Sequence, residues 1–439
     1  MLPERVQRLF EPGSRAMQLA RLFNDAGHEL YLVGGSVRDA ILNRTADDQD
    51  YDFATDARPE AVKELVGSWA QNLFTAGELF GTVSVVKDGH VLEITTYRSE
   101  VYRAESRQPA VEFSDSIEAD LSRRDFAVNA MALRLQPGVP EPELVDPWGG
   151  LTDLAAGVLR TPQSPEVSFG DDPLRMLRLY RFMATLGFTI DPAAAEAARD
   201  MADRLEIVSA ERIRDEFSKL MLAPAPSAAL MGLVESGLAA HFIPEVPALA
   251  LEEDPHHRHK DVLAHTLAVV DKTPARLEIR LAALYHDVGK PDTREFGPGG
   301  HVSFHHHEVV GARLTRRRLR ALQYPKQVIK DVSQLVYLHM RPHTFKDGWT
   351  DRAVRRYVRD AGTQLEDLNL LVRCDVTTRN EKLERQIQRR IDDLEERITA
   401  LREQEELDRL RAPIDGNAVM EYLGISPGPK VGEAMNLLL

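Results

Sequence analysis

The stretch YLVGGSVRDAILNRTADDQDYDFAT, residues 31–55, decides the fold of the first part of the chain. Its opening YLV is a short apolar strand that ends at Gly34 and Gly35, and SVRDAIL is a helix with Ser36 at its N-cap. Small residues let the backbone approach a phosphate, and a helix N-terminus offers free N–H groups. Arg38, in the first turn, can reach a phosphate oxygen. The stretch therefore predicts a phosphate-binding turn between strand and helix.

The end of the same stretch concentrates negative charge. Asp50 and Asp52 are two residues apart on an expected strand, so both carboxylates point to one side. Two hard oxygen ligands next to phosphates suit Mg²⁺, which binds through few carboxylates. The alternative is an acidic loop before a helix, in which Asp56 is the N-cap of that helix. We expect Asp47 and Asp48 to be solvated loop residues.

Two further strands are expected after this stretch. TVSVV (82–86) and VLEITTYR (91–98) alternate with period two and are separated by the turn signal KDG. Glu93 either lies on the solvent side or is a third carboxylate aimed at a cation. Beyond about residue 160 helical patterns dominate, so the fold class is α+β, with a small sheet and helices first and an all-α body after them.

Composition narrows the class of protein. The chain has 439 residues, a net charge of −14 and one cysteine, Cys374, which fits a reducing compartment. No run approaches the length of a membrane span, so we predict a cytoplasmic protein without a membrane partner. The net charge argues against gross attraction to nucleic acid, so RNA would bind basic patches such as 122–125, 313–320 and 352–359. A solvated helix face is the alternative for the last two.

The stretch DDPLRMLRLYRF (171–182) predicts a helix that can select a base. Its charged residues Asp172, Arg175, Arg178 and Arg181 step by three, so neighbouring side chains touch. A carboxylate accepts from the exocyclic amine of cytosine or adenine, and a guanidinium donates to the adjacent ring acceptor. The alternative is an ordinary amphipathic helix with an exposed ion pair.

The order of these motifs resembles the class II tRNA nucleotidyltransferases, the CCA-adding enzymes that share a polymerase-β-like head with bacterial poly(A) polymerases. The resemblance covers about residues 30–222 and rests on YLVGGSVRDAIL, DYDFAT, EITTYR, DLSRRDFAVNAMA, DDPLRMLRLYRF and SAERIRDEFSKLML. It implies two-metal nucleotidyl transfer with Mg²⁺. The residues implied in that site are Asp50, Asp52 and Glu93 for catalysis and Gly34, Gly35, Ser36, Arg38 and Arg124 for the nucleotide.

The resemblance also gives roles to the later motifs. Asp172 and Arg175 select the base, while Arg178 and Arg181 support them or bind nucleotide. Asp125 and Asn129 are structural or face the ribose. Two departures from the family pattern, Asp171 in place of Glu and Ala127 in place of Thr, cast little doubt on these roles. Residues 99–113 fit either a mobile loop that serves the change from C to A addition or a plain surface loop.

The histidines of the body resemble the HD superfamily, whose pattern is His, then His-Asp, then Asp. His265, His286, Asp287 and Asp375 match it in order, with His307 as a further ligand at the usual spacing and His339 near it. Imidazoles with carboxylates suit a divalent metal, a transition metal included. The resemblance implies a phosphatase or phosphodiesterase acting on small phosphate esters or 2′,3′-cyclic ends.

The expected domains are a nucleotidyltransferase head (1–160), a helical neck with the selecting helix (161–240), an HD-type helical domain (241–380) and a helical tail that contacts RNA (381–439). The leading function is addition of C, C and A to the tRNA 3′ end from CTP and ATP. A poly(A) polymerase, a CC-only or A-only enzyme, and a protein that is chiefly an HD phosphohydrolase remain alternatives. The motifs define no oligomeric state, and the ending GEAMNLLL, inside an expected helix, predicts a truncated chain.

Overall fold

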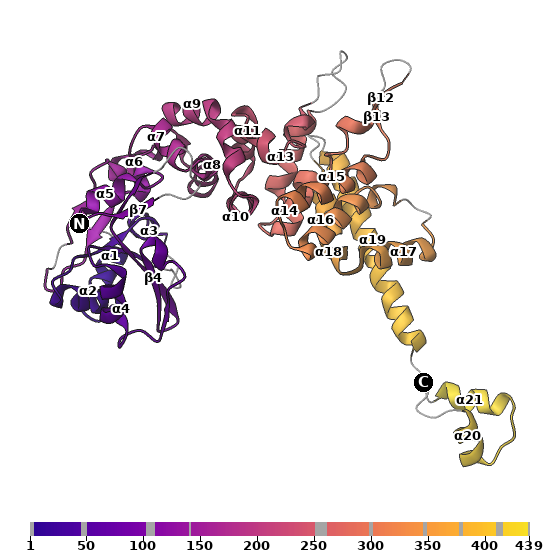
Figure 1. The fold of residues 1–439 in the computed structure, drawn as a ribbon. Helices are drawn as coiled ribbons and strands as arrows, with labels where there is room; N and C mark the ends of the chain where they lie inside the picture. Colours follow the sequence, from indigo (N-terminus) through magenta and orange to yellow (C-terminus); the bar gives the residue numbers. More distant parts are fainter. Residues whose placement is uncertain are drawn as a thin grey trace. The chain divides into compact units, whose positions relative to one another are not determined.

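The computed structural model describes residues 4–44, 51–101, 110–139, 142–250, 261–297, 302–345, 349–376, 381–409 and 416–437. Asp47, Asp48 and Asp50 therefore lie outside the described residues. The chain divides into two compact units, one made of residues 1–250 with 318–324 and one made of residues 251–317 with 325–439. In Figure 1 the sheet belongs to the first unit, at the indigo and purple end of the colour bar.

The first unit is built on a mixed sheet. Within the described ranges it has seven strands in the order β3-β4-β5-β2-β1-β8-β9, in which β2 and β5 run parallel and the other neighbours antiparallel. The strands are β1 Leu30–Val33, β2 Tyr51–Thr55, β3 Asn72–Phe74, β4 Thr82–Lys87, β5 His90–Thr96, β8 Ala132–Arg134 and β9 Leu144–Val145. The apolar strand, the hairpin and the α+β class predicted from the sequence are confirmed.

The helices of the head are α1 Glu4–Leu9, α2 Arg15–Asp25, α3 Gly35–Ile41, α4 Pro59–Val66 and α5 Ile117–Ser122. Two predicted N-caps are wrong. Gly34, not Ser36, is the N-cap of α3, because the helix begins at Gly35, two residues earlier than a cap at Ser36 requires. Arg58 precedes α4, since Pro59 fixes its start, and Asp56 instead accepts from the Glu29 amide at 2.8 Å.

Residues 98–113 are more regular than a plain loop. β6 Arg98–Val101 and β7 Ala110–Phe113 pair antiparallel, with Arg98 opposite Phe113. The loop predicted over 99–113 is therefore wrong at both ends, because alternating residues there pair as strands. Residues 102–109, where the rest of that prediction falls, lie outside the described residues.

Helices follow the sheet in the same unit: α6 Gly150–Ala156, α7 Pro165–Asp171, α8 Leu174–Leu186, α9 Pro192–Asp200, α10 Ala210–Met221, α11 Ser227–Glu235 and α12 Leu238–Phe242, with a small pair of strands, β10 Val158–Leu159 and β11 Thr189–Ile190. α8 is central because it packs against both α10 and α11. Its apolar stripe, Leu174, Leu177 and Tyr180, is buried as the period predicts. A Cβ on Gly232 would lie 2.5 Å from the Tyr180 ring, so α11 can approach α8 closely.

The described part of the second unit is almost entirely helical. Its elements are α13 Val262–Lys272, α14 Leu277–Tyr285, β12 Arg294–Phe296, β13 Val302–Phe304, α15 His307–Ala321 (of which residues 318–321 belong to the first unit), α16 Lys326–Leu338, α17 Asp351–Ala361, α18 Leu365–Cys374, α19 Glu381–Arg409, α20 Gly416–Leu423 and α21 Pro429–Leu437. Ile391, Leu394 and Ile398 are buried on the face of α19 that packs against α17 and α18. Among the described helices, none combines the length and apolar character that crossing a membrane requires.

Candidate functional site

The turn between β1 and α3 is the one predicted to bind a phosphate; its residues Gly34, Gly35 and Ser36 are called here the phosphate cradle. Gly34 has φ +71° and ψ −136°, a conformation that side chains other than hydrogen strongly disfavour. A Cβ at this position would also lie 2.6 Å from Nη1 of Arg124. Gly34 thus lets the backbone turn and lets the Arg124 guanidinium lie directly beside it.

Asp52 lies next to this cradle. Its backbone amide donates to Ser36 Oγ at 3.4 Å, so the start of β2 is tied to the first turn of α3. Asp52 is directly opposite Glu93 in the parallel register of β2 and β5, so both side chains are on the same face. Asp52 is half-buried and Glu93 exposed. The structure therefore brings two of the predicted carboxylates together, while Asp50 lies outside the described residues.

Arg38 is buried beside the cradle and bonded to other side chains of the protein. Its Nη1 donates to Asn129 Oδ1 at 2.6 Å, and its Nε and Nη2 donate to Asp39 at 2.8 Å. The side chain is 9% exposed. Its predicted contact with a phosphate would require these bonds to be exchanged.

Asp125 is the centre of a buried polar network that joins the head to α8. It accepts from Asn129 Nδ2 at 2.9 Å and from Arg178 Nε at 2.9 Å. Arg178 and Arg181 also form ion pairs with the buried Glu216 of α10, at 3.3 and 2.6 Å. Burial opposes the ionisation of Asp125, but the Arg178 guanidinium and the Asn129 amide hold its pKa well below its usual range.

Asp172 and Arg175 make their hydrogen bonds to different partners. Asp172 ends α7, where its Oδ1 accepts from the Leu174 amide at 3.2 Å and its Oδ2 accepts from Arg212 at 2.7 Å. Arg175 is buried and donates to Ser168 Oγ at 3.0 Å and to the carbonyl of Arg123. The helix α8 begins at Leu174, after Asp171 and Asp172, so Asp172 lies at the junction of α7 and α8.

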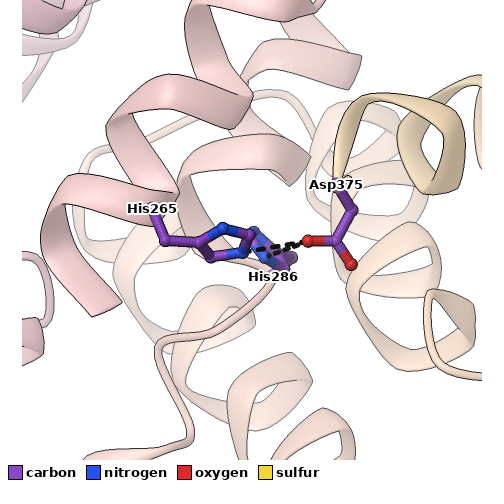
Figure 2. A group of neighbouring side chains, drawn as sticks. All are labelled: His265, His286 and Asp375. Carbon is purple, nitrogen blue, oxygen red and sulfur yellow. Dashed lines mark ion pairs between the residues drawn. The ribbon is translucent and has the colours of Figure 1, made fainter. Parts of the chain in front are cut away.

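The second unit gathers a cluster of imidazoles and carboxylates, called here the HD cluster: His265, His286, Asp287, His307, His339 and Asp375. His265 lies on α13, while the others lie at ends of helices, His286 after α14, His307 at the start of α15, His339 after α16 and Asp375 after α18. Figure 2 shows His265 and His286 directed at the Asp375 carboxylate. The two imidazole Nε2 atoms lie 3.0 and 3.3 Å from Asp375 Oδ1.

The HD cluster forms two trios, His265–His286–Asp375 and Asp287–His307–His339, in each of which the ligand atoms lie within 4.8 Å of one another. Asp287 connects them, because its Oδ2 is 3.2 Å from His286 Nε2 and its Oδ1 is 3.5 Å from His307 Nε2. His286 Nε2 is buried and makes no hydrogen bond of good geometry. A buried polar atom without such a partner is costly, so the residues fit a divalent metal ion as their common partner.

Backbone carbonyls orient three of these imidazoles. Nδ1 of His286, His307 and His339 each lies 2.6–2.8 Å from the carbonyl oxygen three residues earlier, on Ala283, Phe304 and Val336. When Nδ1 donates to that carbonyl, Nε2 is the nitrogen directed into the cluster, and it can bind a metal once it has lost its proton.

The charges of the cluster perturb its own titration. Burial lowers the pKa of His286, but the carboxylates of Asp287 and Asp375 outweigh it and raise that pKa to about 10. Burial and the neighbouring His286 lower the pKa of His339 to about 3. Asp287 is also 2.6 Å from Lys290 Nζ, and its pKa is well below the usual range because His286 and Lys290 outweigh its burial.

Comparison with known proteins follows the same division of the chain. Residues 30–160 match the family described as poly A polymerase head domain, residues 187–249 the probable RNA and SrmB-binding site of polymerase A, and residues 258–397 the HD domain. The chain is 37% identical over 251 residues to the CCA-adding enzyme of Lactobacillus gasseri, which covers 57% of this chain and 59% of the relative. It is 39% identical over 225 residues to that of Bacillus subtilis, covering 51% and 54%.

A solved structure agrees over nearly the whole chain. The Bacillus stearothermophilus CCA-adding enzyme in complex with CTP is 25% identical, has a TM-score of 0.60, and the match covers 96% of this chain and 90% of that one. The chain thus resembles CCA-adding enzymes in fold, and poly A polymerases and HD-domain proteins in its successive parts. The aligned part spans between half and two thirds of the length of the curated relatives.

Three residues near the two sites, Arg212, Glu216 and His343, were not singled out from the sequence. Arg212 and Glu216 on α10 lie in SAERIRDEFSKLML, one of the motifs of the resemblance, but that motif gave them no role. In the structure they are partners of Asp172 and of Arg178 and Arg181. His343, which is 3.2 Å from Asp375 Oδ2, stands only four residues after His339. That close spacing of two histidines was the one sequence signal for a second imidazole near the cluster.

Proposed function

We propose that the protein adds C, C and A to the 3′ end of tRNA, using CTP and ATP, by metal-dependent nucleotidyl transfer in the cytoplasm. The observation that carries this proposal is the register of Asp52 and Glu93, which places two carboxylates on one face beside the phosphate cradle. The relatives named CCA-adding enzymes support the choice of reaction. Template-free addition of the same three nucleotides requires both a transfer site and a base-selecting site, and the first unit offers a candidate for each.

In the head, separate groups would bind the triphosphate and the metal ion. The backbone of Gly34–Ser36 binds the triphosphate, since the first N–H groups of α3 point at it. Arg124, packed against Gly34, orients a phosphate or sugar oxygen. Asp50 and Asp52 would hold Mg²⁺, with Glu93 in support, because the available donors are hard oxygens. When bound, the metal supplies charge stabilisation to the attacking and leaving oxygens of an in-line displacement.

Base selection would rest on Asp172 and Arg175. Arg212 holds one oxygen of Asp172 at 2.7 Å and the Leu174 amide holds the other, so the carboxylate has a fixed direction. It can accept from the exocyclic amine that both C and A carry. U and G have an oxygen at the corresponding position, which cannot donate. Arg175 would contribute its donors once it exchanges its contacts with Ser168 and the Arg123 carbonyl. Arg178 and Arg181 would not contact the base. They would position the selecting residues through their ion pairs with Asp125 and Glu216.

The test is an incorporation assay on tRNA that lacks its terminal nucleotides, with each labelled nucleotide in turn and Mg²⁺. We expect C addition from CTP alone, then one A when ATP is present, with growth stopping after three nucleotides. Long A tracts would instead identify a poly(A) polymerase, and arrest after two C or addition of A only would identify a partial enzyme. No incorporation by an intact, folded protein would contradict the proposal.

A second activity is favoured by the HD cluster. We propose that the second unit is a metal-dependent phosphohydrolase, because six ligand side chains converge and the buried His286 Nε2 lacks a good hydrogen bond. Water oxygen would form a bond to phosphorus, the ester P–O bond would break, and the leaving alcohol would take a proton. Small phosphate esters and 2′,3′-cyclic ends are the substrate class that the fold family implies.

Its test measures bound metal and phosphate release together. His286→Asn should lower the bound divalent metal, measured by elemental analysis, and abolish release from a 3′-phosphorylated nucleotide. His306→Asn is the matched control, since His306 is 82% exposed, next to His307, and has a positive φ that Asn tolerates. Equal metal and equal rates in both variants would contradict a role for the cluster.

A further inference from the structure

A groove of about 890 Å³ runs along the first half of α19. Its lining residues are Phe345, Lys382, Arg385, Gln386, Arg389, Arg390 and Asp393. The six residues from α19 are spaced by three and four, so they form a single face of the helix. This face is distinct from the buried stripe of Ile391, Leu394 and Ile398 that packs on the body.

The groove is strongly cationic in a chain that is acidic as a whole. Among its described lining residues, four are Lys or Arg and one, Asp393, is acidic, against a net charge of −14 for the chain. Lys382, Arg385 and Arg389 are exposed. A concentration of one sign in a concave surface focuses the local field on ligands of opposite charge. The groove therefore favours an anion, and one with several charges.

Three acidic residues of the same helix form ion pairs outside the groove. Glu384 lies 3.8 Å from Lys272, and Asp392 and Glu395 each form an ion pair with Arg373 at 2.7 Å. These ion pairs attach α19 to α13 and α18. These three carboxylates are thus directed toward the body and not into the groove.

The groove leads to the HD cluster through direct contacts. Arg390 Nη1 donates to the His343 carbonyl at 3.4 Å. The imidazole of the same His343 lies 3.2 Å from Asp375 Oδ2, a carboxylate of the cluster. Phe345, two residues further along, is buried and forms an apolar part of the groove wall. One end of the groove is therefore adjacent to the Asp375 side of the cluster.

We propose that this groove binds the single-stranded end of an RNA and presents its terminal phosphate to the HD cluster. The proposal rests on the phosphohydrolase function proposed above and names its substrate class. Lys382 and Arg390 are ~12 Å apart along the helix axis, which is longer than one phosphate and matches a backbone with several. Because Phe345 is buried, the groove holds the backbone by charge and does not stack bases, so we expect no sequence preference.

The experiment compares Arg389→Glu with Arg402→Glu in the full chain. Arg402 is an exposed arginine on the same helix beyond the groove, so the two reversals change the net charge equally. The first probe is a labelled single-stranded RNA of twelve nucleotides that ends in a 3′-phosphate, titrated at several salt concentrations. Arg389→Glu should weaken binding by ~10-fold. It should also reduce the slope of log K against log salt concentration by about 0.7 for each phosphate that the variant no longer neutralises, whereas Arg402→Glu should change neither quantity.

The second probe is a mononucleotide 3′-phosphate. Phosphate release from the RNA should fall ~10-fold in kcat/KM in Arg389→Glu, while release from the mononucleotide stays at the wild-type rate. Equal loss on both substrates would overturn the proposal in favour of a mononucleotide pocket, and unchanged RNA binding would overturn it outright. If the wild type releases phosphate from neither substrate, the hydrolase function fails, and the binding titration still decides whether the groove holds RNA.

Discussion

Asp52 on β2 and Glu93 on β5 lie directly opposite each other on neighbouring parallel strands, and the amide of Asp52 is tied to Ser36 at the start of α3. Like charges on one face repel each other, and a cation bound between them would remove that repulsion. The helix N-terminus beside them supplies part of the compensation for bound phosphates. A metal–triphosphate complex satisfies both features at once.

The first prediction concerns this pair. Asp52→Ala should reduce nucleotide incorporation by on the order of 10³-fold or more, because a metal ligand is removed, while phosphate release by the second unit persists. Glu93→Gln should cost roughly 10–100-fold, as expected of a supporting carboxylate. Glu64→Gln, an exposed charge on α4, is the control for removal of one acidic group. Single-turnover incorporation measures all three, and equal rates would contradict the assignment.

The second prediction concerns Gly34. Gly34→Ala should destabilise the protein by about 1–3 kcal/mol from its backbone conformation and should also raise KM for the nucleotide, because the new Cβ displaces Arg124. Gly27→Ala is the control, since Gly27 also has a positive φ but its Cβ would meet nothing within 4 Å. Urea unfolding should show a loss of stability in both variants. The KM for the nucleotide should rise only in Gly34→Ala. A binding defect of the same size in Gly27→Ala would contradict this role.

The third prediction concerns the buried carboxylate of Asp125. Because its pKa is depressed in the folded state, the unfolded state binds more protons at acid pH, so the stability it contributes is present above the unfolded pKa and is lost as pH falls through and below that value. Asp125→Asn should cost roughly 2–3 kcal/mol at pH 7, less than for a fully buried pair because Arg178 is 31% exposed and keeps Glu216.

The same variant should also weaken the dependence of unfolding free energy on pH between about pH 5 and pH 2. Asp115→Asn, whose side chain is 92% exposed, should change neither quantity measurably. Urea unfolding at a series of pH values measures both. An unchanged acid slope in Asp125→Asn would show that other groups account for the acid sensitivity.

The fourth prediction concerns Arg212 as a positioning residue. Arg212→Ala should lower the preference for CTP over UTP roughly 10-fold by freeing the Asp172 carboxylate. Stability should change little, because the Arg212 side chain is 53% exposed. Arg214→Ala, on the same helix, is the control, and the kcat/KM ratio of the two nucleotides is the readout. A change in RNA affinity without a change in that ratio would contradict the role.

The fifth prediction concerns the shared ligand of the HD cluster. Since Asp287 touches both trios, Asp287→Asn should remove most of the bound divalent metal, whereas His339→Asn should remove only a part of it. Elemental analysis after dialysis gives the metal content, and chelation should lower the unfolding temperature of the wild type more than that of Asp287→Asn. Equal metal content in the two variants would contradict a bridging Asp287.

The sequence alone determined the elements and their faces. Apolar and alternating patterns fixed the strand before Gly34, the hairpin strands and the buried stripe of α8, because these features follow from the backbone periods of 2 and 3.6. The order of histidines and aspartates indicated a metal-binding domain for a different reason: it resembles the HD pattern, and a metal site needs particular residue types. Local start signals were less informative, and the caps expected at Ser36 and Asp56 were wrong.

Only the tertiary structure decided which charged groups are partners. Asp172 pairs with Arg212, which is forty residues away, instead of with the neighbouring Arg175. Arg38 turns inward to Asn129, and the cationic face of α19 meets the cluster through His343. The sequence pattern around a charged side chain does not identify its partner, because an ion pair depends on which helices the folded core brings into contact. That information is long-range, and it appears only when the elements are packed together.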